Sequence, residues 1–161
     1  MYVDFNQMPD FARVWVYQAD RTLTDQEARE IKNRLTAFCE GWNTHGNMMP
    51  TSFKLIDNQI ILLAVDESRL GASGCSIDSS VRILRELESK LGINLTDQGK
   101  VSYKNEHKIQ VSPALGIKSK VLSGEITVDT EVINPLIKEK SDLNQLWIPA
   151  KTSWLNKFFP N

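Results

Sequence analysis

Two stretches of the chain repeat apolar residues at intervals of three and four, the period of one face of an α-helix. The first stretch carries Ala28, Ile31, Leu35, Phe38 and Trp42, and the second carries Ile77, Val81, Leu84, Leu87 and Leu91. Thr24 and Glu27 open the first stretch at the spacing of a capping box. Gly92 follows the second stretch, and glycine is common just beyond a helix end. The pattern predicts two amphipathic helices.

Apolar and β-branched residues form three strand-like runs in the first half of the chain. One is RVWVYQA over 13–19, and the other two lie within TSFKLIDNQIILLAVDE over 51–67. Asp57 and Asn58 favour a hairpin turn between these two. The run IILLAV over 60–65 is apolar at every position, and such a strand is usually covered on both faces.

The second half of the chain has weaker signals. VSYK and HKIQV predict a short hairpin around Asn105, and Pro113 opens a brief helix that Gly124 closes. ITVDTEVI over 126–133 predicts one more strand, and Ser141 is a candidate cap for a short helix. We expect the aromatic tail to pack onto the body of the protein.

The order of these elements predicts the fold. The first part reads β-α-β-β-α-β, which matches the split βαβ, ferredoxin-like arrangement, in which the first and third strands are central. These are the two most apolar runs. We therefore expect an α+β protein of one domain, 1–161, with a ferredoxin-like core over about 10–111. A C-terminal α/β extension over about 112–161 is expected to pack on that core.

This topology brings two remote segments to one end of the fold. If the first strand runs up, the loops 41–51 and 66–76 both lie at the bottom. The candidate ligand-binding residues there are Trp42, Asn43, Asp66, Ser73, Gly74 and Ser76, and the candidate catalytic residues are Cys75 and His45.

The stretch GASGCSIDSSVR over 71–82 carries most of this chemistry. A helix N-terminus with small residues suits a bound anion. The alternative is that Ser76 caps the helix and Asp78 complements its dipole. Cys75 precedes the helix, where a thiolate is favoured, and His45 could act as its base. Cysteine is also often a small core filler. Trp42 continues the apolar face of its helix and is equally explained as a core or rim residue.

Nucleotide motifs are incomplete. GWNTHGNM, from Gly41, has the glycine spacing of a P-loop, but Asn47 and Met48 stand where that loop needs Lys and Ser or Thr. IILLAVDE over 60–67 imitates the acidic strand of ATPases, but without a phosphate loop it is more simply a core strand that ends in a polar turn. LSGE over 122–125 imitates an ABC signature but follows that strand, whereas ABC domains carry it before. We expect no ATPase activity.

The composition of the chain restricts the classes of partner and the cellular location that we expect. The chain has 161 residues, a net charge of -1 and a pI of about 6.1, which argue against bulk electrostatic binding of nucleic acid. The two cysteines fit a reducing compartment, and we find neither a signal peptide nor a run of the ~20 apolar residues that span a membrane. We expect a cytoplasmic protein with no metal and no cofactor, whose partner is a small anion or a protein, and which could form a homodimer.

The stretches RVWVYQADR, FCEGWNTHG and SGCSIDSSVRIL resemble an uncharacterised bacterial protein family, as does the closing pattern of Trp147, Pro149, Ser153 and Trp154. Its members are often labelled ABC transporter ATPase. The resemblance covers nearly the whole chain and carries over no catalytic residue.

Three hypotheses stay open. The leading one is a binding or interaction module with a small-anion site at the 41–51/66–76 end. The second is a small enzyme that uses Cys75 as nucleophile and His45 as base on acyl or phosphoryl substrates. The third, implied by the resemblance, is an ATP-binding protein related to ABC transporters.

Overall fold

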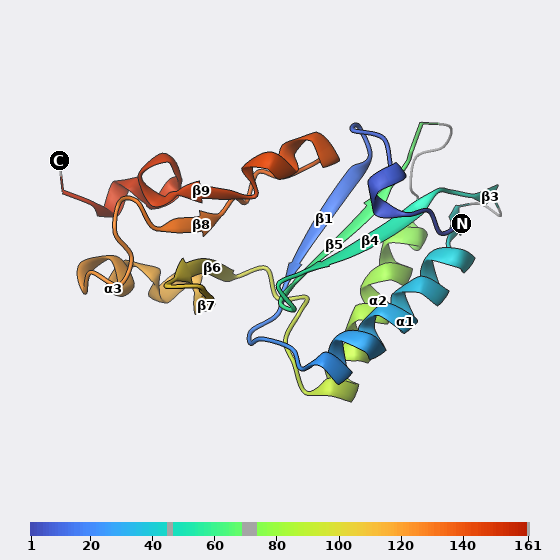
Figure 1. Cartoon of the computed structure of the whole chain (residues 1–161), viewed down its shortest axis with the longest axis horizontal. Coiled ribbons are helices and arrows are strands. Elements are labelled where there is room, and N and C mark those ends of the chain that lie inside the picture. Colours follow the sequence, from blue (N-terminus) through green and yellow to red (C-terminus); the bar gives the residue numbers. More distant parts are fainter. Residues whose placement is uncertain (45–46, 69–73, 161) are drawn as a thin grey trace. The chain divides into compact units, whose positions relative to one another are not determined.

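The structure is a computed structural model that describes residues 1–44, 47–68 and 74–160. The α+β class predicted from the sequence is confirmed. The chain divides into two compact units: unit 1 is Met1–Thr96 with Lys138–Ser141, and unit 2 is Asp97–Ile137 with Asp142–Asn161 (Figure 1). The sequence suggested one domain with a change near residue 112, whereas the division between the units falls after Thr96.

Unit 1 is built on a three-stranded antiparallel sheet with the order β1-β5-β4. The strands are β1 (Arg13–Gln18), β4 (Thr51–Ile56) and β5 (Ile60–Val65), and the helices are α1 (Asp25–Gly41) and α2 (Gly74–Leu91). Figure 1 shows the two helices side by side on one face of the sheet. Their apolar faces form one core with that face of the sheet; its fully buried members include Ile31, Leu35, Ile61, Leu63 and Leu84.

Local signals set the ends of these elements where the sequence predicted them. Glu27 N–H donates to Thr24 Oγ1 at 3.1 Å and Thr24 N–H donates to Glu27 Oε1 at 2.9 Å, so the capping box is present. Asp57 and Asn58 both have positive φ, at 52° and 51°, as a tight hairpin turn between twisted strands requires. Gly92 ends α2 at φ 66°, a conformation that glycine adopts without strain.

Among the described residues of unit 1, the sheet has three strands and lacks the fourth strand of a ferredoxin-like sheet. The run that was expected to supply it is β6 (Lys100–Asn105), which pairs with β7 and β8 in the sheet of unit 2. A four-stranded ferredoxin-like sheet is therefore not confirmed, and β5 is the central strand. The residues Lys100–Tyr103 of β6 are all buried, so both faces of the strand are covered there, and the apolar alternation of its sequence does not specify which strand lies beside it.

A short segment, Lys138–Ser141, lies along the outer edge of β1; we call it the edge segment. Val14 N–H donates to Lys138 C=O at 2.8 Å, and Arg13 forms an antiparallel bridge with Glu139. Just upstream, Leu136 N–H donates to Asn134 Oδ1 at 3.0 Å, which makes a turn and not an extended strand. Lys140 N–H and Ser141 N–H donate to Ala12 C=O and Asp10 C=O at 2.9 Å each, so the edge segment bonds to the start of β1 and to the residues just before it.

The N-terminal residues cover part of the other face of the sheet. A 3-10 turn, η1 (Phe5–Gln7), holds Phe5 with its ring centroid 5.7 Å from Lys54 Nζ of β4. Lys140 of the edge segment donates to Met8 C=O at 2.7 Å and to Asn6 C=O at 3.3 Å. This cover accords with the burial of all six residues of β5, which the uniformly apolar run IILLAV predicted.

Unit 2 contains a four-stranded antiparallel sheet with the order β7-β6-β8-β9. Besides β6 these are β7 (Lys108–Pro113), β8 (Glu131–Ile133) and β9 (Trp147–Pro149), with the helix α3 (Ile117–Leu122) and the 3-10 turns η2 (Ala114–Gly116), η3 (Lys140–Gln145), η4 (Ala150–Thr152) and η5 (Trp154–Phe158). The residues of η3 from Asp142 on belong to this unit. The tail packs on the core of unit 2 through the fully buried Leu155 and the partly buried Phe158 and Phe159, whereas Trp154 is exposed.

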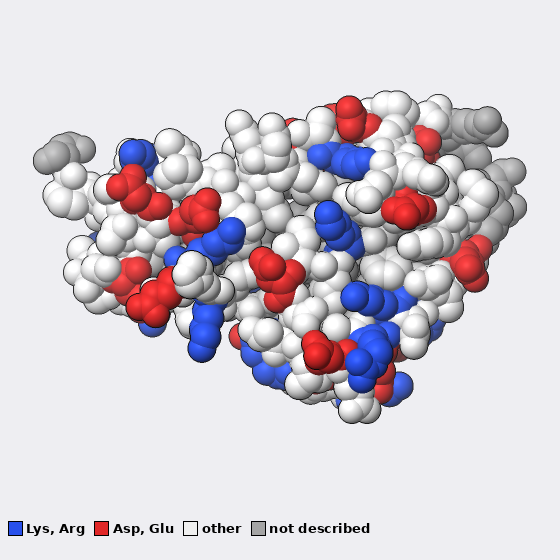
Figure 2. All heavy atoms as spheres, in the orientation of Figure 1, with Lys and Arg blue, Asp and Glu red and all other residues white. Residues whose placement is uncertain are grey.

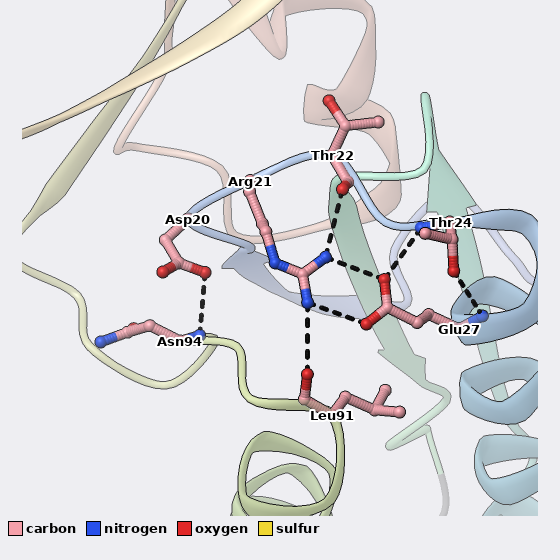
Figure 3. A network of polar contacts seen from close by, with 7 residues as sticks. All are labelled: Asp20, Arg21, Thr22, Thr24, Glu27, Leu91 and Asn94. Atoms are coloured by element: carbon pink, nitrogen blue, oxygen red, sulfur yellow. Dashed lines mark hydrogen bonds and ion pairs between the residues drawn. The ribbon is translucent and has the colours of Figure 1, made fainter.

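A polar network closes the end of unit 1 at which the β4–β5 turn lies (Figure 3). Arg21 makes two bonds of 2.8 Å to the Glu27 carboxylate and one of 3.2 Å to Leu91 C=O, at the end of α2. Arg21 thus connects the first turn of α1 to the last turn of α2. These contacts, led by the Arg21 bonds, lower the pKa of Glu27 to about 2.

Candidate functional site

The two segments that the sequence placed together do meet, at the opposite end of unit 1. Thr51, which opens β4, pairs with Val65, which closes β5, and Asp66 N–H donates to Pro50 C=O at 2.9 Å. Helix α1 ends at Gly41 and α2 begins at Gly74 at this same end (Figure 1). The alternating direction of consecutive elements therefore places the end of α1, the start of α2, the start of β4 and the end of β5 at one end of unit 1.

Trp42 lies in the core of unit 1. Its side chain is 4% exposed, and its ring centroid lies 5.3 Å from that of Phe38 and 6.4 Å from that of Trp15. Its indole Nε1 is buried and has no hydrogen-bond acceptor among the described residues. Of the core or rim position that the helical pattern predicted, the structure shows the core position. A buried N–H donor that has no acceptor among the described residues is costly in a folded protein.

Asp66 follows β5 and is half-buried. Its Oδ1 accepts a hydrogen bond of 2.9 Å from Ser68 N–H, so the carboxylate is used in a local turn. Asn43 lies in the two-residue strand β2 (Asn43–Thr44), which pairs with β3 (Asn47–Met48).

The remaining candidates are only partly covered by the structure. Gly74, Cys75 and Ser76 form the first turn of α2, where the backbone alone is described. His45 and Ser73 lie outside the described residues. Because α2 begins at Gly74, Ser76 lies inside the first turn and is not the residue that caps the helix, and Cys75 lies within the helix and not before it. The pairing of Cys75 with His45 stays a prediction.

Three residues that sequence reasoning did not select also lie at this end. The Arg13 guanidinium carbon is 4.6 Å from the ring centroid of Trp15, and Arg13 Nη1 is 3.5 Å from Glu67 Oε1. Two signals were available: Arg13 and Trp15 are two apart in a strand, hence on one face, and Glu67 follows the central strand. Neither signal showed that Arg13 and Glu67, which are 54 positions apart in the sequence, are in contact.

Cys39, in the last turn of α1, is buried and free. Burial raises the pKa of its thiol to about 12, so it stays protonated and unreactive at neutral pH. The backbone C=O of Cys39 accepts a bond of 2.8 Å from the Met1 ammonium, which also donates to Met49 C=O at 3.0 Å. A positive charge near the C-terminal end of a helix is stabilising. The last turn of α1 has no basic side chain, and the Met1 ammonium supplies the positive charge there.

The described residues contain no group of three or more His, Cys, Asp and Glu side chains that could hold a metal ion. Within 1–44, 47–68 and 74–160, no helix combines the length and the apolar character needed to cross a membrane. On the face drawn in Figure 2, the basic and acidic side chains of the described residues are interspersed.

No protein-family model matches the sequence, and no curated protein or solved structure is significantly similar to it.

Proposed function

We propose that the protein is a cytoplasmic binding module without ATPase activity, and that it holds a small anion at the end of unit 1 formed by 41–51 and 66–76. The observation that carries the proposal is the meeting of these segments, with the Asp66–Pro50 hydrogen bond at their junction. Helix α2, 18 residues long, starts there, and the N-terminus of a helix favours negative charge. Trp42 Nε1, which has no acceptor in the part of the chain that the structure describes, is a further hydrogen-bond donor of the residues at this end.

The proposal also covers the topology of unit 1 and the partners of the protein. We interpret unit 1 as a ferredoxin-like unit in which the edge segment takes the place of the fourth strand, because that segment also runs antiparallel to β1. A protein partner and a homodimer stay predictions. Membership of the family labelled ABC transporter ATPase would instead predict binding of Mg-ATP.

Amide NMR spectra of the full chain test the proposal directly. Sodium phosphate, sodium acetate and Mg-ATP are titrated separately, with ionic strength held constant by sodium chloride. We expect saturable shifts of amide signals within 41–51 and 66–78 with phosphate or acetate, and no release of phosphate from Mg-ATP. Shifts that track ionic strength alone would refute the anion site. Tighter binding of Mg-ATP than of phosphate, with hydrolysis, would favour the ATPase hypothesis.

Thiol labelling distinguishes the enzyme hypothesis from the binding module. Because Cys39 is buried and its thiol stays protonated, labelling of the folded chain reports on Cys75. A binding module predicts either no labelling or an ordinary alkaline pH dependence. Rapid labelling below neutral pH, lost in a Cys75→Ala variant and reduced in a His45→Gln variant, would instead support a nucleophile with its base.

A further inference from the structure

The Arg13 guanidinium is held in place by Trp15, and among the described residues it makes one hydrogen bond, to Glu67. It lies 4.6 Å from the Trp15 ring centroid, and 48% of the side chain is exposed. Contact with an aromatic face fixes the plane of a guanidinium while leaving its N–H groups available at the edge. Arg13 therefore presents an oriented set of donors at the end of unit 1.

Glu67 satisfies these donors poorly. Arg13 and Glu67 make one contact of 3.5 Å, whereas Arg21 and Glu27 in the same unit make two contacts of 2.8 Å. Paired bonds near 2.8 Å are the favourable geometry between a guanidinium and an oxyanion. Glu67 thus neutralises Arg13 without occupying its full donor set.

A chain of aromatic contacts connects Arg13 to the buried indole of Trp42. The Trp15 ring that carries Arg13 lies edge-on to the Trp42 ring, with centroids 6.4 Å apart. Trp42 Nε1 has no acceptor among the described residues. One aromatic cluster therefore holds both a guanidinium with donors to spare and a buried N–H donor.

We infer that Arg13 is the residue that binds the ligand's oxyanion, and that Glu67 is an internal carboxylate which this oxyanion displaces. The ligand is a small molecule that carries a carboxylate or a phosphate group. The inference rests on the proposed function and names the residue and the ligand chemistry of the same end of unit 1. Binding exchanges the single 3.5 Å contact for paired bonds to the ligand.

The test measures dissociation constants of sodium phosphate and sodium acetate for the full-length wild type and two variants at constant ionic strength. Backbone amide and Trp indole NMR signals report binding. Glu67→Gln removes the internal competitor and should tighten binding about twofold to fivefold, the range of an exposed ion pair. Arg13→Gln should weaken binding by at least about tenfold, because it removes charge-assisted bonds. A preference for phosphate over acetate, or the reverse, identifies which oxyanion the ligand carries.

Arg34 and Glu86 supply matched controls, because they form another exposed pair in unit 1, at 3.2 Å. Arg34→Gln and Glu86→Gln should leave both dissociation constants unchanged. Arg13→Lys keeps the charge without the planar fork and should bind with intermediate affinity, which guards against a folding defect in Arg13→Gln.

The outcomes separate the two proposals. If phosphate or acetate shifts the amides of 41–51 and 66–78 equally in wild type and Arg13→Gln, the anion site stands and the role of Arg13 is overturned. If Glu67→Gln binds no tighter than wild type, the displacement of Glu67 is overturned. If neither anion binds any of the proteins, both the proposed function and this inference fail.

Discussion

Replacing Arg21 with glutamine tests the polar network of Arg21, Glu27 and Leu91, which lies at the end of unit 1 opposite the candidate site. In the folded protein the pKa of Glu27 falls from its ordinary value of 4.5 to about 2. The largest cause is the pair of 2.8 Å bonds from Arg21, and the next is the 2.9 Å bond from Thr24 N–H. Arg21→Gln removes the first and leaves the second. We expect the pKa of Glu27 to rise well above 2 while staying below 4.5, because the capping-box bond still favours the carboxylate.

The sign of the effect on stability follows from the lowered pKa. A carboxyl group with a lower pKa in the folded state stabilises the protein above its unfolded pKa and loses that contribution as the pH falls through its folded pKa. For Glu27 this window extends from about 4.5 down to about 2. The unfolding free energy of wild type should fall across this window, and that of Arg21→Gln should fall less.

Carbon-13 NMR titration of the glutamate carboxyl groups measures the pKa of Glu27, and urea unfolding at several pH values measures the stability. Arg34→Gln is the control, since Arg34 pairs with Glu86 and not with Glu27. The reasoning is refuted if Glu27 of wild type titrates at its ordinary value. It is equally refuted if Arg21→Gln leaves a low pKa unchanged.

Three further changes have defined outcomes. Gly92→Ala should lower the unfolding free energy in urea by about 1 kcal/mol, because Gly92 has φ 66°; an unchanged value would contradict this. Lys140→Met removes the bonds to Met8 and Asn6 C=O and should cost about 1–2 kcal/mol in the same assay, whereas the exposed Lys32→Met should cost little; equal effects would argue against the bonds. Folded Cys75→Ala should not react with a thiol reagent at pH 8, because the pKa of the remaining Cys39 is about 12, and rapid reaction would show that Cys39 is accessible.

The local features of unit 1 were predictable because their free energy depends on residues close in the chain. The Thr24–Glu27 capping box and the Asp57–Asn58 turn each depend on only a few neighbouring residues. The apolar faces of α1 and α2 follow from helical periodicity, and they are buried as that periodicity requires.

The pairing of strands was less predictable. In unit 2, ITVDTEVI predicted a strand over 126–133, and the observed β8 is only Glu131–Ile133. Thr127 and Thr130 bond to each other instead, through a 2.9 Å bond from Thr127 N–H to Thr130 Oγ1. Side-chain bonds of this kind compete with a strand ladder, and β propensity alone does not decide between them.

The position of the candidate site was predictable from the sequence, but its side-chain contacts were not. Alternating element directions predicted that 41–51 and 66–76 lie at one end, and the Asp66–Pro50 bond agrees with that. The contacts of Arg13 with Trp15 and Glu67 were not predicted, because no pattern in the chain encodes a side-chain contact between distant segments.

The sequence by itself determined the α+β class, the start of α1, the β4–β5 turn, the end of α2 and the apolar faces that form the core of unit 1, because hydrophobic periodicity and capping act over a few residues. Only the tertiary structure decided that β6 belongs to a second sheet, that the edge segment lies beside β1, and that Trp42 Nε1 has no acceptor among the described residues. These features depend on which distant backbone and side-chain groups come within hydrogen-bonding distance, and that depends on the packing of the whole unit.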